Sequence, residues 1–464
     1  MTYGALRASV LKGETSFEQA VQSMLTQIAS HNPHLNALLE VYEEEALEAA
    51  RQYDIQVSQK KSLPPLAGLV YVHKDNIALA GHRLSAASRI LEGYVSPFSA
   101  TAIERLQVAG AICIGRANCD EFAMGSSNEN SAYGAVRHPF LLGYVPGGSS
   151  GGSAAAAAAG FCHVALGSDT GGSIRQPAAF CGLYGLKPTY GRISRYGLIA
   201  YASSFDQIGP ISASLPDLIA VYEVMAGLDP RDATSSARPV EPYQPAPCPR
   251  RWAVLAPEGL HPEVAHRWED LLLRLRQAGF TIEKIDFPYW EYLVPTYYIL
   301  TTAEASSNLA RYDGVRYGYR SRQANNLYQL YALSRSQGFG QEVKRRILLG
   351  TFVLSAGYYD AYYTRAQKVR RILYEYTEKL LSQYAILLMP TSATPPFRLG
   401  EKTTDPIQMY LSDLLTVYAN LTGHPALQVP LPGEGMPVGV QLVGKMFAEN
   451  TLFCSADAMV RLYS

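Results

Sequence analysis

Apolar residues at helical spacing mark the first predicted element of the chain. Ser16 and Gln19 form a capping box, which is typical of a helix N-terminus. The apolar residues that follow fall on one helical face, at Phe17, Ala20, Val21, Met24, Leu25 and Ile28. The pattern then predicts a buried strand at 69–74, a helix at 101–109 that ends before Gly110, and a strand at 111–115. Strand, helix and strand in this order indicate a βαβ unit.

The same alternation continues to the end of the chain. We predict a helix at 154–159, a strand at 162–166 and a helix at 215–226. Residues 229–249 are rich in proline, serine, alanine and arginine, which is typical of a surface linker. Beyond it, a strand at 252–256, a helix at 262–278 and a strand at 280–285 precede a helical, tyrosine-rich segment at 289–384. The pattern predicts an α/β fold, a sheet flanked by helices.

Composition and charge narrow the class of protein. The chain has 464 residues, of which 48 % are hydrophobic and 17 % charged, as in ordinary globular proteins. Its longest uniformly small or apolar run, 154–159, is far too short to span a membrane, and the N-terminus has no apolar signal core. We therefore expect a cytoplasmic protein without a membrane partner. The six cysteines show no metal-finger spacing, so we expect free thiols and no metal site.

The net charge is zero, with 40 basic and 40 acidic residues. A protein that grips RNA through its phosphates usually carries a basic excess or a basic stripe, and neither is present in the sequence. We expect any nucleic acid to be held mainly by a partner.

Glycine and serine gather in PGGSSGGS, from Pro146, and in SDTGGS, from Ser168. Glycine lets backbone N–H groups approach a substrate oxygen closely, as a developing oxyanion requires. Ser149 and Ser173 lie in these two segments, and Lys74 ends the upstream apolar run. A lysine neutralised by burial can act as a base, so the arrangement suggests a serine hydrolase that works without histidine.

Two other interpretations remain open from the residues. GGSSG formally matches the GxSxG nucleophile elbow of α/β-hydrolases, with Ser149 as nucleophile and His424 as the best late histidine. Pro146 argues against the strand that this elbow needs. A nucleotide-binding module is weaker still, because neither GxxxxGK[ST] nor an ordered GxGxxG follows a predicted strand. We interpret Ser150 and Ser153 as loop or cap hydroxyls, and Asp75 as an orienting residue at most.

Several ordered motifs together resemble the amidase signature family. They are GLVYVHKDNI around Lys74, ANCDEFAMGSSNENSAYG from Ala117, the glycine-serine segments, and ASSFDQIGP from Ala202. The second half contributes PTYYIL around Tyr297, KRRILLGTFVLSAGYYDAYY around Arg346 and MYLSDLLTVYANLTGHP around Asp413. With these, the chain most resembles the A subunits of tRNA-dependent amidotransferases. The resemblance implies a single amidase domain over 1–464 with a large mixed β-sheet flanked by helices on both faces.

Within that domain we expect an N-terminal helical segment over about 1–60 and a signature core over about 61–227. A proline-rich linker covers about 228–250. Sheet completion and the substrate-pocket helices then occupy about 251–464. These boundaries rest on the shifts in composition and periodicity described above.

The resemblance also implies roles for the candidate catalytic residues. Ser173 is the nucleophile, Lys74 the base, and Ser149, on a cis peptide bond in this family, the bridge between them. The oxyanion hole is formed by backbone N–H groups of Thr170, Gly171, Gly172 and Ser173. No metal or cofactor is expected in this chain.

The resemblance further implies glutamine as the substrate. Arg346 would hold its α-carboxylate, Asp413 its α-ammonium, and Tyr297 would orient its side chain. The ammonia would pass to a B subunit that uses ATP and magnesium on Glu-tRNA(Gln), Asp-tRNA(Asn) or both, with a C subunit completing the complex. A stand-alone amidase acting on an uncharged amide is the competing assignment, and it would have no use for the Arg346 and Asp413 pair.

Overall fold

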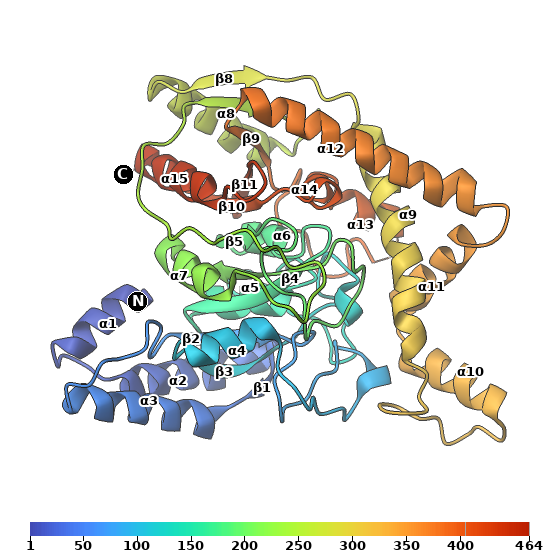
Figure 1. The fold of residues 1–464 in the computed structure, drawn as a ribbon, viewed down its shortest axis with the longest axis horizontal. Coiled ribbons are helices and arrows are strands. Elements are labelled where there is room, and N and C mark those ends of the chain that lie inside the picture. Colours follow the sequence, from blue (N-terminus) through green and yellow to red (C-terminus); the bar gives the residue numbers. More distant parts are fainter. Residues whose placement is uncertain (404, 464) are drawn as a thin grey trace.

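The computed structural model describes residues 1–403 and 405–463, and its centre is one mixed sheet (Figure 1). The eleven strands of the sheet run in the order β1-β3-β2-β4-β6-β5-β10-β11-β9-β7-β8. Their bounds are β1 (Leu38–Val41), β2 (Val70–Lys74), β3 (Ile112–Ala117), β4 (Val164–Asp169), β5 (Tyr184–Lys187), β6 (Gln207–Ser212), β7 (Arg251–Val254), β8 (Thr281–Lys284), β9 (Ile386–Pro390), β10 (Ala426–Leu431) and β11 (Val438–Val443).

Helices surround this sheet and extend beyond one end of it (Figure 1). Their bounds are α1 (Tyr3–Leu11), α2 (Phe17–Leu35), α3 (Glu43–Ser58), α4 (Thr101–Val108), α5 (Gly151–Ala158), α6 (Arg175–Phe180), α7 (Leu215–Met225), α8 (Pro262–Gln277), α9 (Trp290–Asn308), α10 (Leu327–Gly338), α11 (Gln341–Val353), α12 (Arg365–Gln383), α13 (Pro406–Leu411), α14 (Val417–Thr422) and α15 (Glu449–Val460). Short 3-10 turns lie at Arg89–Leu91, Glu121–Ala123, Leu309–Arg311 and Arg461–Tyr463, and a π-helical turn at Tyr359–Thr364.

Side-chain alternation along the strands explains why both faces of the sheet are covered. In β9, Ile386 and Leu388 pack into a core that contains residues of α4, α7, α8 and α15. Leu387 and Met389 point the other way, into a core with α9, α12 and α14. Successive strand residues point to opposite faces, so a strand that is apolar throughout must be buried on both. The α/β fold with helices on both faces is confirmed.

The predicted βαβ unit is present. β2 and β3 are parallel neighbours joined through α4, and β2 also pairs in parallel with β4. The capping box of α2 is formed, with Ser16 Oγ accepting from the Gln19 N–H at 3.0 Å. Strands β7 and β8 and helix α8 lie where the periodicity placed them, within a few residues. Local patterning therefore located these elements in both halves of the chain.

The proline-rich segment at 228–250 contains no helix or strand, as expected of a linker. Strands before and after it belong to the same sheet. The division into segments within one domain stays a prediction. All six cysteines are free. Within the described residues, no helix has both the length and the apolar character needed to cross a bilayer.

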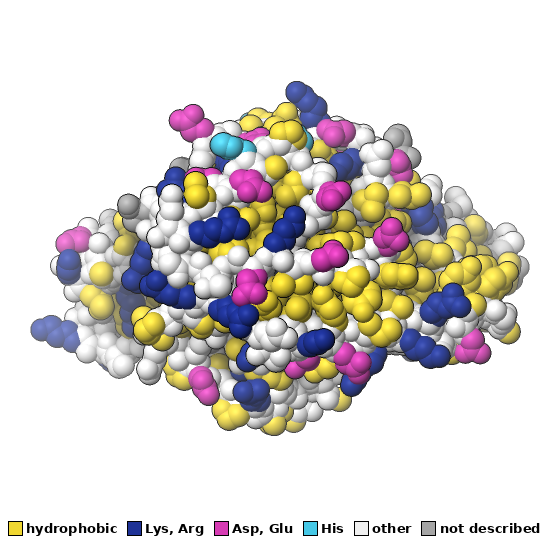
Figure 2. Space-filling view, turned by 90° about the horizontal axis from the view of Figure 1, so that it is seen from above, with side chains coloured by type: hydrophobic (Ala, Val, Ile, Leu, Met, Phe, Trp, Pro, Cys, Tyr) yellow, Lys and Arg dark blue, Asp and Glu magenta, His cyan; other side chains and the backbone are white. Residues whose placement is uncertain are grey.

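Apolar side chains gather over a broad area of one face of the molecule (Figure 2). Exposed apolar residues on α11 and the turn after it are Leu348, Phe352, Tyr358, Tyr359 and Tyr362. Phe352 lies 4.3 Å from Tyr358 between ring centroids, so these rings form one cluster at the surface. Contiguous exposed apolar areas are typical of surfaces that contact other molecules.

Candidate active site

Lys74 is the last residue of β2, and its side chain is fully buried among three serine hydroxyls. Its Nζ lies 2.7 Å from Ser149 Oγ and 3.0 Å from the Oγ atoms of Ser150 and Ser168. Burial lowers the pKa of Lys74 to about 8, although nearby carboxylates oppose the shift. A lysine with such a pKa is partly neutral near physiological pH, so it can accept a proton.

Ser149 lies between Pro146 and the start of α5, in a segment that contains no strand. The Gly148–Ser149 peptide bond is cis, as the family resemblance implies. The Ser149 carbonyl accepts from the Asp120 N–H at 3.1 Å. The next residue, Ser150, donates its N–H to the Ser173 carbonyl at 3.2 Å. The backbone therefore joins the two glycine-serine segments that lie 24 positions apart at Ser149 and Ser173.

Ser173 follows β4 at the end of the glycine turn and is 8 % exposed. Its Oγ forms no hydrogen bond with any residue of 1–403 or 405–463. The turn is held instead by Asp169, whose carboxylate accepts from the Gly172 N–H at 2.9 Å and pairs with Arg175 at 3.0 Å. A fixed backbone with an unengaged hydroxyl is the arrangement that a nucleophile needs.

Burial raises the pKa of Asp169, but the Arg175 guanidinium and the hydrogen bond from Asn420 outweigh it and hold the pKa at about 2. Asp169 is therefore ionised at any working pH. Its charge fixes the turn between β4 and α6, because charge-assisted hydrogen bonds are stronger than neutral ones.

The predicted oxyanion residues differ in what their N–H groups do. The Gly172 N–H already donates to Asp169. The N–H groups of Thr170, Gly171 and Ser173 have no acceptor among the described residues, so they are the ones left for a substrate oxygen. Backbone donors held in a rigid turn can stabilise an oxyanion without reorganising.

The glycines of this turn are required by close packing. A Cβ on Gly171 would lie 2.5 Å from the Tyr297 hydroxyl, and one on Gly172 would overlap Thr416. The Thr416 Oγ1 donates to the Gly171 carbonyl at 2.6 Å. Tyr297, a predicted substrate-binding residue, therefore lies directly against the predicted oxyanion turn.

Arg346 projects from α11 and is only 3 % exposed, whereas its neighbour Arg345 is exposed. Its Nε donates to Glu342 Oε1 at 2.8 Å and its Nη1 donates to the Tyr201 hydroxyl at 2.9 Å. Within the described chain, Nη2 has no hydrogen-bond partner. The basic run 344–346 is thus not one solvated patch, because its last guanidinium turns inward with a free donor.

Asp413 and Arg346 both contact Tyr298. Asp413 Oδ2 accepts from Ser126 Oγ at 2.8 Å and from the Tyr298 hydroxyl at 3.2 Å. The Arg346 guanidinium carbon lies 5.2 Å from the centre of the Tyr298 ring. Burial raises the pKa of Asp413 to about 7. Arg346 lies over the Tyr298 ring and Asp413 accepts from its hydroxyl, so a cation and an acid contact one side chain. Such a pair suits the α-carboxylate and α-ammonium of an amino acid.

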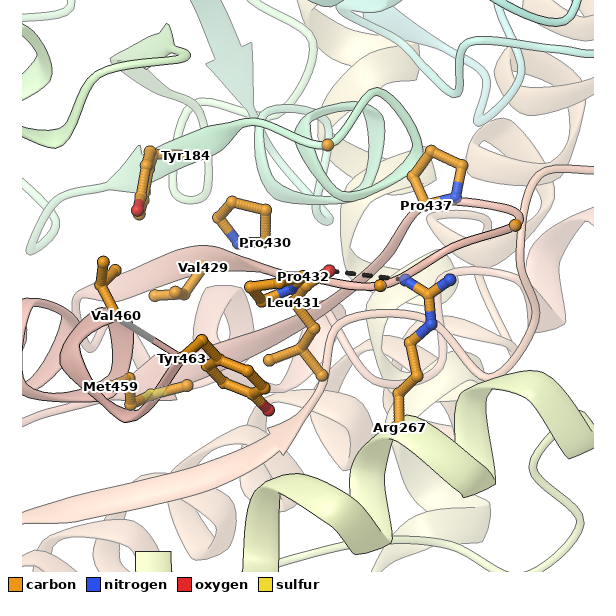
Figure 3. Close-up of a pocket in the computed structure, with 13 residues that line it drawn as sticks. Tyr184, Arg267, Val429, Pro430, Leu431, Pro432, Pro437, Met459, Val460 and Tyr463 are labelled. Atoms are coloured by element: carbon orange, nitrogen blue, oxygen red, sulfur yellow. Dashed lines mark hydrogen bonds between the residues drawn. The ribbon is translucent and has the colours of Figure 1, made fainter. Parts of the chain in front are cut away.

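A small cavity of about 120 Å³ reaches Arg346 from the surface. Its lining includes Gly125, Ser127 and Asn130 of the ANCDEFAMGSSNENSAYG motif, and Tyr410 of α13. A larger pocket of about 320 Å³ lies between β10, α8 and α15, around Arg267 (Figure 3). None of the predicted site residues lines the larger pocket, so its size does not identify the reactive centre.

The α/β-hydrolase interpretation fails on geometry. No strand runs into Ser149, and His424 Nε2 lies 2.7 Å from Glu378 Oε1 rather than near a serine. No group of three or more His, Cys, Asp or Glu residues in the described chain could hold a metal ion. The basic side chain that contacts Ser149 is Lys74.

Sequence reasoning missed part of the site. Ser150 is the N-cap residue of α5, but its hydroxyl makes no cap hydrogen bond and accepts from Lys74, a contact that the sequence did not indicate. Ser168 also contacts Lys74 and accepts from Asn76 Nδ2 at 2.9 Å. Asp75 points away to Arg116, as strand alternation predicted. Ser168 begins the SDTGGS segment, and this position was the one feature of the sequence that could have indicated its place in the site.

Comparisons with known proteins show the family to which the chain belongs. The family model described as Amidase matches residues 19–453. The A subunit of the glutamyl-tRNA(Gln) amidotransferase of Chlorobium phaeobacteroides is 50 % identical over 99 % of this chain and 98 % of its own length. That of Thermosynechococcus vestitus is 48 % identical over 98 % and 96 %.

Two solved structures show the same fold. The A subunit of the glutamyl-tRNA(Gln) amidotransferase of Thermotoga maritima is 40 % identical, with a TM-score of 0.79 over 98 % of this chain and 93 % of that one. The peptide amidase of Stenotrophomonas maltophilia is 29 % identical, with a TM-score of 0.83 over 99 % and 96 %. The chain belongs to the amidase family and, within it, groups with the A subunits of glutamyl-tRNA(Gln) amidotransferases.

Proposed function

We propose that this chain hydrolyses the side-chain amide of glutamine at Ser173 and supplies the ammonia to an amidotransferase. The observation that carries the proposal is the coincidence of two features at one glycine turn. The buried Lys74–Ser149 hydrogen bond is joined to the turn through the Ser150–Ser173 backbone contact. Arg346 and Asp413 both contact Tyr298, whose ring packs on Tyr297 against the same turn. The first provides a base, and the second recognises a free amino acid.

The proposed reaction proceeds through an acyl-enzyme. Ser173 Oγ attacks the amide carbon of glutamine, while its proton passes to Ser149 and the Ser149 proton passes to Lys74. Free N–H groups of the turn stabilise the oxyanion. The C–N bond then breaks, and a proton returns from Lys74 through Ser149 to the leaving ammonia. Water, deprotonated by the same pair, attacks the acyl carbon and releases glutamate, which restores the Ser173 hydroxyl.

The competing function is a stand-alone amidase. The peptide amidase structure shows that this fold is compatible with other amides. A site for an uncharged amide would gain nothing from burying Arg346 and Asp413, because burying charged groups is costly unless a ligand or partner compensates them. The unpartnered Arg346 Nη2 therefore favours glutamine.

We further propose that this chain works with B and C subunits in the cytoplasm. The B subunit would bind ATP and magnesium, hold most of the tRNA and transfer ammonia to Glu-tRNA(Gln), the acceptor in the relatives' names. The balanced charge of the chain and the apolar surface at 348–362 support a role as one component of a complex. Aspartyl-tRNA(Asn) is the second acceptor to be tried in the same assay.

The test measures glutamate and ammonia release by the chain alone and with its partner subunits. Ser173→Ala should abolish release, and Ser149→Ala or Lys74→Ala should lower kcat by roughly two orders of magnitude or more. Ser336→Ala, an exposed serine on α10, is the matched control and should leave the rate unchanged. Retention of glutaminase activity by Ser173→Ala would sink the mechanism.

Substrate choice is tested with a second pair of variants. Arg346→Ala and Asp413→Asn should raise KM for glutamine far more than KM for a short uncharged amide such as butyramide. Equal losses on both amides would show that the two residues support the fold rather than bind the α-groups.

A further inference from the structure

Glu121, in the ANCDEFAMGSS motif, is a buried carboxylate that the mechanism does not use. It is 4 % exposed and lies at the start of a 3-10 turn in which Phe122 and Ala123 have φ values of 51° and 59°. Left-handed backbone is uncommon for such residues and indicates that the surrounding structure fixes the turn. The Phe122 ring packs at 5.6 Å from Phe339, just ahead of α11.

The Glu121 carboxylate binds the first turn of α11 from outside that helix. Both oxygens accept from the Gly340 N–H, at 3.1 Å for Oε1 and 2.9 Å for Oε2. Gly340 is the N-cap residue of α11 and has no side chain of its own with which to cap it. Ser88 Oγ also donates to Oε1, which fixes the carboxylate from a third segment.

A side chain at Gly340 would meet the Glu121 carboxylate. The φ of −71° and ψ of 172° at Gly340 suit any residue, so backbone freedom does not explain the glycine. A Cβ built there would overlap Glu121 Oε2. The two residues therefore fit each other across 219 positions of sequence.

Helix α11 carries Arg346, six residues beyond Gly340. A helix rises about 1.5 Å per residue, so the guanidinium is anchored about 9 Å along the axis from the cap. Asp120 precedes Glu121 in the sequence. It donates its N–H to the Ser149 carbonyl. Its carboxylate accepts from the Asn128 N–H at 2.9 Å. The Asp120–Glu121 pair thus connects the Ser149 segment to the helix that bears Arg346.

The ionisation of Glu121 suits its place at the N-terminus of α11. Burial raises its pKa to about 7, while the hydrogen bonds from Ser88 and Gly340 and the nearby Lys344 and Arg89 oppose the rise. The carboxylate is mostly ionised above pH 7, and it stays ionised above pH 8, where Lys74 is mostly neutral. A negative charge at a helix N-terminus is stabilised by the helix dipole.

We propose that Glu121 is a positioning residue for glutamine recognition, which caps α11 from outside and fixes Arg346 at its distance from the Ser173 turn. The inference rests on the proposed glutaminase function. It assigns Glu121 no contact with substrate, and its effect runs through Arg346.

The experiment compares Glu121→Gln and Gly340→Ala in the full chain, alone and with partner subunits. Loss of a helix cap costs about 1 kcal/mol, which corresponds to roughly a fivefold change in an equilibrium constant. KM for glutamine should rise about fivefold or more in both variants, with kcat within about threefold and butyramide kinetics unchanged. Glu92→Gln, which removes an exposed charge beside the Ser88 turn, is the matched control and should behave as the wild type.

A double-mutant cycle separates positioning from simple destabilisation. In an Arg346→Ala background, Glu121→Gln should add little to KM, because the residue that it positions is gone. Additive losses, or equal losses with glutamine and butyramide, would overturn the proposal. So would failure of both Glu121→Gln and Gly340→Ala to fold, judged by circular dichroism, since the contact would then serve the fold alone.

Failure of the proposed glutaminase function and failure of the Glu121 positioning role give different results. A wild-type chain with partners that does not hydrolyse glutamine would remove the proposed function. Normal glutamine hydrolysis, with KM raised by Arg346→Ala but not by Glu121→Gln, would remove only the positioning role.

Discussion

The titration of Lys74 gives a quantitative test of the proposed base. Burial lowers its pKa to about 8, and only the neutral amine can take the proton that Ser149 passes on. The neutral fraction is then about one hundredth at pH 6, about one tenth at pH 7, about half at pH 8 and about nine tenths at pH 9. We expect kcat/KM to rise about 90-fold from pH 6 to pH 9 and to level off above it.

The assay uses butyramide rather than glutamine. Asp413 has a pKa of about 7 and would add its own ionisation to the profile if the substrate carried an α-ammonium. An uncharged amide makes no demand on Asp413 or Arg346, so the inflection reports the base. Ammonia release is measured at each pH after circular dichroism has shown that the chain remains folded.

A second buried lysine provides the matched control. Burial lowers the pKa of Lys187 to about 7, and its Nζ donates to the Pro188 carbonyl, away from the serines. Lys187→Met should leave the inflection near pH 8. A flat profile between pH 6 and 9, an inflection near pH 10, or a shift caused by Lys187→Met would refute Lys74 as the base.

Three further predictions concern stability, the glycine turn and RNA. Arg175→Met leaves the buried Asp169 charge unpaired and should lower the free energy of unfolding by about 3–5 kcal/mol in urea titrations; a loss below about 1 kcal/mol would contradict this. Gly171→Ala forces a Cβ against the Tyr297 hydroxyl and should lower kcat for glutamine at least about tenfold, whereas Gly4→Ala, in open space, should not. Equal rates in both would show that the turn adapts. The isolated chain, with zero net charge, should bind tRNA weakly in gel-shift titrations at physiological salt, and micromolar or tighter binding would oppose the charge argument.

Much of the fold could be predicted from local patterns. A few adjacent residues are enough to recognise several features. These are the capping box at Ser16, the buried run that ends at Lys74, and the helix ends before Gly110 and Gly279. The strands of the second half were harder to find. β9 is apolar throughout, and β10 and β11 are apolar except for the buried Gln428 and Gln441, because both faces of these strands are buried. They therefore lack the alternation that marks a strand with one exposed face.

The sequence also indicated some residues of the candidate site, whereas other contacts in the site became visible only in the structure. Glycine-serine segments and a lysine at the end of an apolar run pointed to Lys74, Ser149 and Ser173, and the ordered family motifs around them supplied their expected roles. The sequence did not indicate that Ser150 and Ser168 also contact Lys74, nor that Arg346 turns inward while Arg345 stays exposed. In a helix, the direction of a side chain depends on what packs against that helix, here Tyr201 and Tyr298 of other segments.

By itself the sequence determined the elements, the glycine turn and the kinds of groups available for chemistry, because these depend on neighbouring residues. Only the tertiary structure decided which of those groups meet. The pKa of Lys74 is lowered by burial that the whole sheet creates, and the Glu121–Gly340 contact joins segments that no local pattern relates. Burial and long-range contact are properties of the packed chain, since they depend on how distant strands and helices exclude water together.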